Sequence, residues 1–180
     1  MGKQSIQQWL RWAMVLSLIS LLVSCSPVNN LKGSILNSRY SDEQPALSGN
    51  GQLISFVSNR DGKQQIIVYD LLKQEVVTLP HLSQGREIAE NPSLSRTGRY
   101  LTYIANYLGR PEIILYDRAT QREEVLTRGY RGWLRNPKIS VDGRYVVFET
   151  SRRGQWDIEV LDRGPNIELD ITDDTGRWRD

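Results

Sequence analysis

The 180-residue chain has one cysteine, Cys25, and one histidine, His81. A single cysteine has no disulfide partner within the molecule. One imidazole cannot build a multi-histidine metal site, and no G-x-S-x-G turn is present to suggest a Ser-His-Asp hydrolase. The sequence also lacks a phosphate-binding loop and a dinucleotide fingerprint. We therefore expect no enzymatic activity, no cofactor and no metal, and we interpret His81 as a solvated loop residue.

Long hydrophobic runs are scarce as well. The longest, residues 13–23, has 11 residues, which is too short to cross a bilayer core but suits a secretory signal. Lys3 and Arg11 precede it, and no acidic residue does. The run ends in Leu-Val-Ser followed by Cys25. This N-terminus resembles a bacterial lipoprotein signal.

The resemblance implies that Cys25 carries a diacylglycerol group and that residues 1–24 are removed as a signal peptide. Residues 25–43 would then form a lipidated tether. Ser26 follows the cysteine, and in lipoproteins of double-membrane bacteria a residue other than Asp there implies the outer membrane. We expect a membrane-anchored protein of the cell envelope that faces the periplasm. The alternative is an ordinary secretory signal with an incidental cysteine near its cleavage site.

Neither sign of charge is in excess. The chain has 23 Lys and Arg against 21 Asp and Glu, a formal net charge of +2. Because Lys3 and Arg11 belong to the expected signal, the mature part keeps 21 basic and 21 acidic residues. A neutral domain offers no electrostatic reason to bind nucleic acid.

What the chain does have is an ungapped repeat of 27 residues. The three copies cover residues 44–70, 91–117 and 136–162, and the proline at the second position of each recurs after 47 and 45 residues. A period of about 40–50 residues built from short strands is typical of β-propeller blades.

Each copy has the composition of most of one blade. A proline-led segment, a glycine turn and an apolar strand come first, and a second glycine turn and a β-branched strand ending in Asp follow. A weaker fourth strand is expected at 76–79, 124–127 and 169–172. The blades then cover about 44–80, 91–127 and 136–172. After residue 25 no segment keeps a 3.6-residue apolar period, so we expect essentially no helix.

The pattern P-x-[LI]-S-x-x-G-x-[LYV]-[ILV]-x-[FY], then a glycine turn and I-x-[VL]-[YL]-D, resembles the WD40-like (PD40) repeats of the TolB propeller family. Residues 137–148 are nearest to the family's usual P-x-W-S-P-D-G-x-x-I-A-F, although its tryptophan is leucine or isoleucine in all three copies. The resemblance implies an all-β fold of three four-stranded antiparallel blades within residues 44–180.

Three blades are fewer than the four to eight that close a propeller. Such a row leaves one face uncovered at each end. We expect the open faces to contain Ile54, Phe56 and Val57 on the first blade, and Val146, Phe148 and Trp156 on the third. Two copies would close six blades, the number found in the TolB propeller. The alternatives are a protein partner, a shortened gene product, or capping by the chain's own tails, and residues 34–36 are placed to form an outer, closing strand of the first blade.

Glycine and aspartate recur at fixed turn positions. The residues are Gly51, Gly98, Gly143, Asp70, Asp117 and Asp162. The glycines should adopt positive φ in equivalent strand-to-strand turns. The aspartates end equivalent strands, where a carboxylate accepts hydrogen bonds from the following turn. The alternative for the aspartates is a ring that binds a cation; the turn interpretation is favoured.

One cluster suggests a surface that binds a partner. Arginines alternate with aromatic residues in the link before the third blade and in a turn of that blade: Arg128, Tyr130, Arg131, Trp133, Arg135, Arg152, Arg153 and Trp156. Arg, Tyr and Trp dominate interface hot spots, and the same side chains stack on sugars or contact anionic polymers. In the opposing interpretation the rings fold beneath the loop and the arginines are solvated.

We therefore expect a lipid-anchored, non-enzymatic envelope protein that uses TolB-like blades for protein–protein interaction, for example in a Tol-like envelope assembly. The expected partner is another envelope protein or a second copy of the chain. The alternative is a carbohydrate-binding or carbohydrate-processing propeller. A lyase of that kind would need a base and usually a metal cluster, which one histidine does not supply.

Overall fold

Eleven β-strands and one 3₁₀ turn, Arg60–Gly62, make up the part of the chain that the structure describes. The computed structural model describes residues 35–36, 38–82, 89–107 and 109–171. The expected signal peptide, Cys25 and residues 26–34 of the tether lie outside these ranges. Within them, no helix has the length and apolar character needed to cross a membrane.

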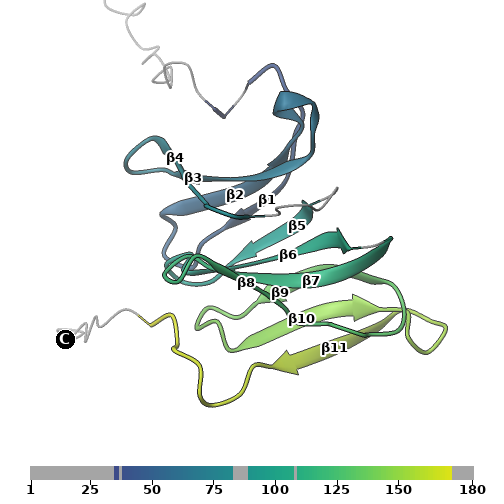
Figure 1. Ribbon diagram of the computed structural model, residues 1–180. Helices are drawn as coiled ribbons and strands as arrows, with labels where there is room; N and C mark the ends of the chain where they lie inside the picture. The colour runs from purple at the N-terminus through teal and green to yellow at the C-terminus, as the bar shows by residue number, and fades with distance from the viewer. Residues whose placement is uncertain (1–34, 37, 83–88, 108, 172–180) are drawn as a thin grey trace, which may run out of the picture. The chain divides into compact units, whose positions relative to one another are not determined.

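The strands form three antiparallel sheets that follow one another in chain order (Figure 1). The first sheet contains β1 (Asp42–Leu47), β2 (Leu53–Ser58), β3 (Gln65–Asp70) and β4 (Glu75–Val77). The second contains β5 (Ala89–Leu94), β6 (Tyr100–Tyr107), β7 (Arg110–Asp117) and β8 (Arg122–Val125). The third contains β9 (Leu134–Ile139), β10 (Tyr145–Thr150) and β11 (Asp157–Asp162). The expected all-β fold of antiparallel blades is confirmed.

The third sheet departs from the expected four strands. Among the described residues β11 has no outer neighbour, and residues 169–171 form no strand. Instead, the Asp170 carboxylate accepts hydrogen bonds from Ser95 Oγ at 2.6 Å, Thr97 N at 2.7 Å and Thr97 Oγ1 at 2.6 Å. Asp170 N donates to Asp142 O at 2.8 Å. These bonds hold the segment on the turns of the second and third blades, so it does not extend the third sheet.

The segment before β1 also differs from expectation. We expected residues 34–36 to form an outer strand of the first blade. For the described residues 35 and 36 this prediction is wrong, because β4 already fills the outer position of this sheet. Ile35 and Leu36 pack on a buried cluster of the first blade that includes Phe56 and Tyr69.

The repeat prolines lie within the first strand of each sheet rather than at its start. Each follows a residue with positive φ, namely Gln44, Asn91 and Asn136, all at 53°. The pairing register of each first strand shifts at this point. Because proline cannot donate to a ladder, a bulge on an edge strand accommodates it.

Alternation along the strands gives each blade two faces. Leu101 and Tyr103 of β6 belong to the cluster shared with the first blade, and Val146 and Phe148 of β10 belong to the cluster shared with the second. The [ILV]-x-[FY] pair of a repeat is thus turned toward the preceding blade.

This orientation corrects the expected open faces. Val146, Phe148 and Val57 are buried between blades, because the period of two turns them inward. Trp156 is exposed in the turn between β10 and β11. The third sheet exposes a different set of apolar side chains, which come from β10 and β11: Tyr145, Val147, Ile158 and Val160.

Candidate functional site

The glycine turns lie at one end of the blades and are occupied by local hydrogen bonds. Gly51, Gly98 and Gly143 have φ angles of 73°, 68° and 82°. In the first of these turns, Ser48 Oγ donates to Asn50 Oδ1 at 2.8 Å. This end of each blade is therefore committed to turn geometry.

The strand-end aspartates also bind turn backbone. Oδ1 of Asp70 accepts from Leu72 N at 2.9 Å and Lys73 N at 3.0 Å. Oδ1 of Asp117 and of Asp162 each accepts the N–H two residues further on, at 2.9 and 2.8 Å. Within the described ranges, no three His, Cys, Asp or Glu side chains group together as ligands for a metal ion.

The eight arginine and aromatic residues singled out in the sequence lie around the link that enters β9 and the turn that follows β10. The two segments are joined by backbone hydrogen bonds. Trp133 N donates to Ser151 Oγ at 2.9 Å, and Ser151 N donates to Trp133 O at 3.0 Å. These residues, together with Arg110, are called the arginine–tryptophan surface below.

Tyr130 is the structural part of this surface. Its ring meets Phe148 edge to face, with centroids 5.8 Å apart, and its hydroxyl donates to a carboxylate oxygen of Glu159. The Arg152 guanidinium lies 5.5 Å from the centroid of the Tyr130 ring. Tyr130 thereby fixes the link on the third blade and positions Arg152.

Arg135, Arg153 and Trp156 are already engaged with neighbours on the third sheet. The Arg135 guanidinium lies 3.8 Å from the Trp156 ring centroid, and its Nε donates to Glu149 Oε2 at 2.5 Å. Hydrogen bonds from Asn136 and then from Arg135 hold the pKa of Glu149 below its ordinary value. Arg153 pairs with Asp157 at 2.9 Å. These three residues have less capacity left for a new anionic partner.

Trp133 and the remaining arginines are available. The Trp133 side chain is exposed, at 65%. It borders a hollow of about 660 Å³ that Arg110, Arg131 and Tyr130 also line. A second hollow of about 390 Å³ lies beside it, between Arg128, Arg131 and Arg152. Among the residues that the structure describes, no carboxylate pairs with Arg110, Arg128 or Arg131. The surface can therefore accept an aromatic or apolar group beside an anionic one.

Arg110 was not singled out from the sequence. It is the first residue of β7 in the second blade, and only the stacking of blades brings it to the link before β9. Only its position in the repeat could have indicated Arg110. It follows Gly109, which has the same place in the second repeat as Gly154 has in the third.

A smaller hollow of about 280 Å³ adjoins Trp133 at the junction of the second and third blades. Glu90, Asn91 and Asn106 contribute polar groups to it, and Leu134 contributes an apolar wall. Asn106 Oδ1 is buried without a hydrogen-bond donor. A donor on a bound group would satisfy this oxygen.

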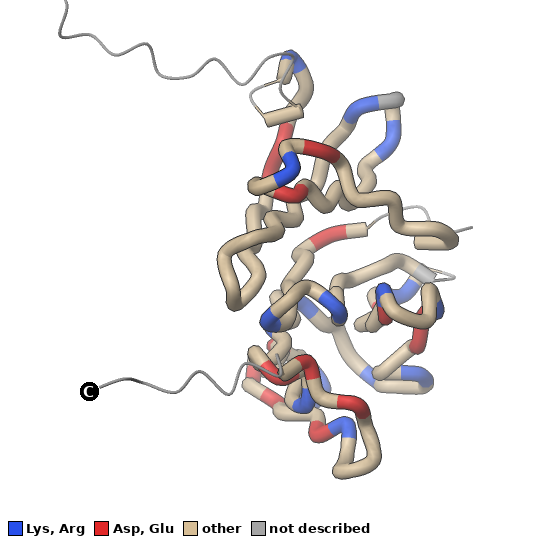
Figure 2. The backbone as a smooth tube through the Cα atoms, turned by 90° about the vertical axis from the view of Figure 1, so that its left-hand side faces the viewer, with Lys and Arg blue, Asp and Glu red and all other residues tan. Residues whose placement is uncertain are grey.

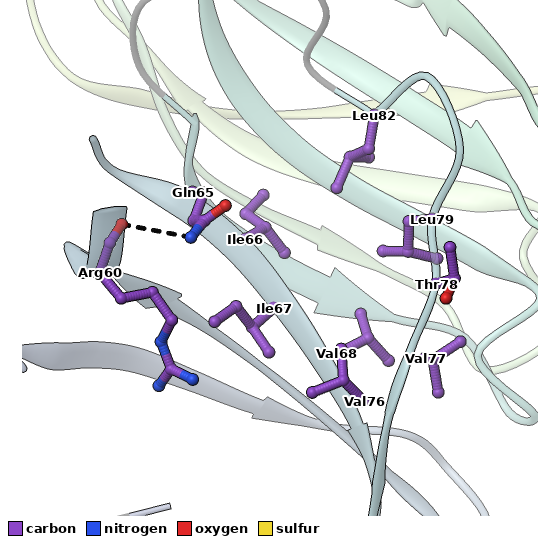
Figure 3. Close-up of a pocket in the computed structure, with 10 residues that line it drawn as sticks. All are labelled: Arg60, Gln65, Ile66, Ile67, Val68, Val76, Val77, Thr78, Leu79 and Leu82. Carbon is purple, nitrogen blue, oxygen red and sulfur yellow. Dashed lines mark hydrogen bonds between the residues drawn. The ribbon is translucent and has the colours of Figure 1, made fainter. Parts of the chain in front are cut away.

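The first blade has a hollow of about 410 Å³ that lacks the grouped arginine and aromatic side chains of the arginine–tryptophan surface (Figure 3). Side chains of β3, β4 and the following link line it, and most are aliphatic. Arg60 is its one ionisable lining residue among those described, and Arg60 O accepts from Gln65 Nε2 at 3.3 Å. His81 is exposed and has a φ of 66°. Both signs of charge occur in each blade when its turns are counted with its strands, so no blade carries charge of a single sign (Figure 2).

No protein-family model matches the chain, and no curated protein matches it. Solved structures do. TolB from Acinetobacter baumannii superposes with a TM-score of 0.60 at 24% identity, over 71% of this chain and 31% of that one. A putative TolB from Agrobacterium tumefaciens gives 0.55 at 24% identity, over 67% and 43%. The fold is that of a TolB-like β-propeller.

The β-propeller domain of the Trilobed protease from Pyrococcus furiosus is also similar, with a TM-score of 0.52 at 17% identity, over 68% of this chain and 39% of that one. The chain therefore spans less than half the length of each of these propellers. The expected TolB-like fold is confirmed, and the described blades make up a part of a propeller.

Proposed function

We propose that the chain is a non-enzymatic, lipid-anchored protein of the bacterial envelope that binds a partner protein through the arginine–tryptophan surface. The TolB-like blades support a role in protein–protein interaction and, coarsely, a place in the envelope. The expected lipidation of Cys25 supplies the anchor on the periplasmic side, with the outer membrane favoured. The partner is another envelope protein, with a second copy of the chain as the alternative.

The observation that carries this proposal is the exposed Trp133 ring between hollows lined by arginines that have no carboxylate partner among the described residues. An exposed tryptophan with neighbouring arginines has the composition of an interface hot spot. The arginines favour an acidic segment on the partner, because guanidinium groups bind carboxylates with two parallel hydrogen bonds. The junction hollow beside Trp133, with its unsatisfied Asn106 oxygen, accepts a neutral donor from the same segment.

The test is photo-crosslinking of the full-length protein in living cells, with p-benzoylphenylalanine at position 133. We expect one dominant crosslinked envelope protein. Replacing Arg131 and Arg152 together by Ala should remove this adduct. The matched control is p-benzoylphenylalanine at position 72, because Leu72 is also highly exposed but lies in the β3–β4 turn of the first blade. Equal adducts at both positions would contradict a specific surface.

The carbohydrate alternative is separated by applying the purified full-length protein to glycan arrays and pectin fragments. Because an exposed tryptophan can stack on a sugar as well as on a peptide, this experiment compares the wild type with Trp133→Ala. Binding to a glycan that Trp133→Ala abolishes, without any protein adduct, would replace the protein partner by a saccharide.

The anchor is tested separately by mass spectrometry of the wild-type protein and of Cys25→Ala. We expect the wild type to carry an acylated N-terminal Cys25, and Cys25→Ala to remain an uncut precursor or an unlipidated soluble protein. A mature wild type without acyl mass would overturn the anchor and leave the binding surface untouched.

A further inference from the structure

Three arginines of the arginine–tryptophan surface share one hollow. Arg128, Arg131 and Arg152 line the hollow of about 390 Å³, together with Gly129 and Tyr130. All three arginines are exposed, and no acidic residue belongs to this lining among the described residues. None of the three forms an ion pair with a described carboxylate. Because like charges around one space repel each other, this arrangement favours a bound anion.

The corresponding position in the first blade shows what the third blade lacks. Arg60 has the same place in the first repeat as Arg152 has in the third. Arg60 donates to Asp42 Oδ1 at 3.1 Å and to the Ile35 carbonyl at 3.0 Å, and its side chain is only 15% exposed. In the third blade Leu134 stands at the position of Asp42. Arg152 therefore lacks the carboxylate that neutralises its counterpart.

The backbone that carries Arg128 is held in place by the protein itself. Tyr130 N donates to Thr127 O at 2.9 Å and closes a turn in which Gly129 has a φ of 75°. Thr127 is buried, and its hydroxyl donates to Glu112 Oε2 at 2.6 Å. Because the turn is already fixed, an anion that binds there does not have to order its backbone first.

Gly132 brings the link against the turn that carries Arg152. Its φ is 118°, and a Cβ on it would lie 2.8 Å from Arg152 N and 2.9 Å from Arg152 Cα. Glycine permits both this conformation and this close approach. The turn at Arg152 is closed by Gly154 N, which donates to Ser151 O at 2.9 Å. The backbone next to Arg131 is thus held against the backbone of Arg152.

The number of arginines indicates which anion the hollow suits. A carboxylate has two oxygens, whereas a phosphate monoester has three acceptor oxygens and a charge of about −1.5 to −2 at neutral pH. Guanidinium groups bind phosphate with pairs of parallel hydrogen bonds. We infer that Arg128, Arg131 and Arg152 form a binding site for a terminal phosphate group. The phosphate belongs to a lipid headgroup or to a soluble phosphate ester, because both present the same three oxygens.

This site goes beyond the proposed function and does not rest on it. Trp133 and Arg110 line the larger neighbouring hollow but not the hollow of the three arginines. Arg131 lines both hollows, and the proposed protein interface uses Arg131 and Arg152 for an acidic segment. A bound phosphate would therefore compete with that segment, whereas Trp133 belongs to the protein interface alone.

The test is isothermal titration calorimetry of the full-length protein in neutral detergent, with glycerol-1-phosphate as the soluble probe and acetate for comparison. We expect saturable binding of the phosphate ester and about 10-fold weaker binding of acetate. Arg128→Ala and Arg152→Ala should each weaken phosphate binding about 10-fold or more, because each removes charge-assisted hydrogen bonds. The matched control is Arg122→Ala, which removes the same charge from an exposed position on β8.

Mixed micelles identify the source of the phosphate. Phosphatidic acid presents a terminal phosphate on a lipid, and phosphatidylglycerol presents a phosphodiester, which has only two free oxygens. Tighter binding of phosphatidic acid than of glycerol-1-phosphate would assign the site to a lipid headgroup, and the reverse order would assign it to a soluble ester. In both cases phosphatidylglycerol should bind more weakly than phosphatidic acid.

Several results would overturn the site. These are acetate that binds as tightly as glycerol-1-phosphate, no saturable binding of any phosphate probe, or equal weakening by Arg122→Ala and Arg152→Ala. Circular dichroism should show every variant folded, because the replaced side chains are exposed. Trp133→Ala should keep phosphate binding. Loss of the crosslinked partner with intact phosphate binding would reject the proposed function alone, and an intact crosslink without phosphate binding would reject this inference alone.

Discussion

The second and third blades carry the same repeat in different surroundings. The second blade has a blade on either side, and both of its faces are buried, whereas the third has a blade on one side only among the residues that the structure describes. The side chains at matching positions are nearly the same: Ile113 corresponds to Ile158, and Leu115 corresponds to Val160. The sequence of a repeat therefore determines which side chains point to each face, and the neighbour determines whether that face meets protein or water.

A second difference between these blades lies in their glycine turns. In the third blade Ser140 Oγ and Arg144 N donate to Asp142 within the turn. In the second blade Thr97 stands at the aspartate position, and the carboxylate comes instead from Asp170. One turn is self-contained, and the other depends on a distant segment.

The largest expected effect separates two matching isoleucines, Ile113 on β7 and Ile158 on β11. Ile113→Ala should lower the free energy of unfolding by about 2–5 kcal/mol, because it opens a cavity between two blades. Ile158→Ala, measured in dilute solution where copies are separate, should change it by about 0.5 kcal/mol or less. Urea unfolding of the two variants gives both numbers. Equal losses would mean that the third blade is covered on both faces.

The next effect compares two glycines that have similar φ angles. A Cβ on Gly143 would lie 2.4 Å from Tyr100 Cδ2, whereas one on Gly51 meets nothing within 4 Å. Gly143→Ala therefore adds steric overlap to the cost of a left-handed backbone, and we expect a loss of about 3 kcal/mol. Gly51→Ala should cost only about 1 kcal/mol. Thermal unfolding of the pair ranks them, and a larger loss for Gly51→Ala would contradict the packing argument.

The hydrogen bonds of Asp170 give an intermediate effect on stability. Here the effect of a second substitution, Thr97→Asp, changes sign according to whether Asp170 is present. Asp170→Ala should cost about 2 kcal/mol, because Ser95 and Thr97 lose charge-assisted hydrogen bonds in a buried site. Thr97→Asp should destabilise the wild type by placing two carboxylates together, yet stabilise Asp170→Ala by restoring the acceptor that the other turns have. A double-mutant cycle measures this reversal. The same effect of Thr97→Asp in both backgrounds would show that the two positions are independent.

The smallest expected effect is on acid stability. Hydrogen bonds, chiefly from Arg144, lower the pKa of Asp162 from 3.8 to about 2. Since the folded-state pKa is below the unfolded one, the stabilisation is complete above about pH 4 and is lost as the pH falls through about 2. Both side chains are partly exposed, so the gain is small. The stability difference between wild type and Asp162→Asn should shrink over this pH range, and a constant difference would exclude the ion pair as its cause.

Much of the fold could be predicted from the sequence because the blade signal is local and repeated. Prolines, glycines and period-two strands recur in step, and these features act within a few residues. The third blade's outer strand was predicted wrongly because the competing interaction is a long-range one: Asp170 accepts hydrogen bonds from Ser95 and Thr97, which lie 75 and 73 residues earlier in the chain. No local pattern reports such a contact.

For the arginine–tryptophan surface, the sequence predicted most of the residues but not the contacts that each of them makes. The alternation of arginine with tryptophan indicated which residues lie near one another, and the structure divides them by partner. Arg135 and Arg153 are taken by Glu149 and Asp157 across a strand pair and within a turn. Arg110 joins the group only through stacking of blades, which a reading along one chain segment does not reveal.

The Asp170 contact also has a consequence for synthesis of the chain. The turn of the second blade contains Ser95, and its carboxylate acceptor is 75 residues later. At a translation rate of about 5–20 residues per second, that acceptor is made roughly 4–15 seconds after the serine. During this interval the second blade has its strands but not its complete turn. The second blade thus gains its final hydrogen bonds only after the strands of the third blade have been synthesised. Completion of the second blade therefore depends on synthesis of the third.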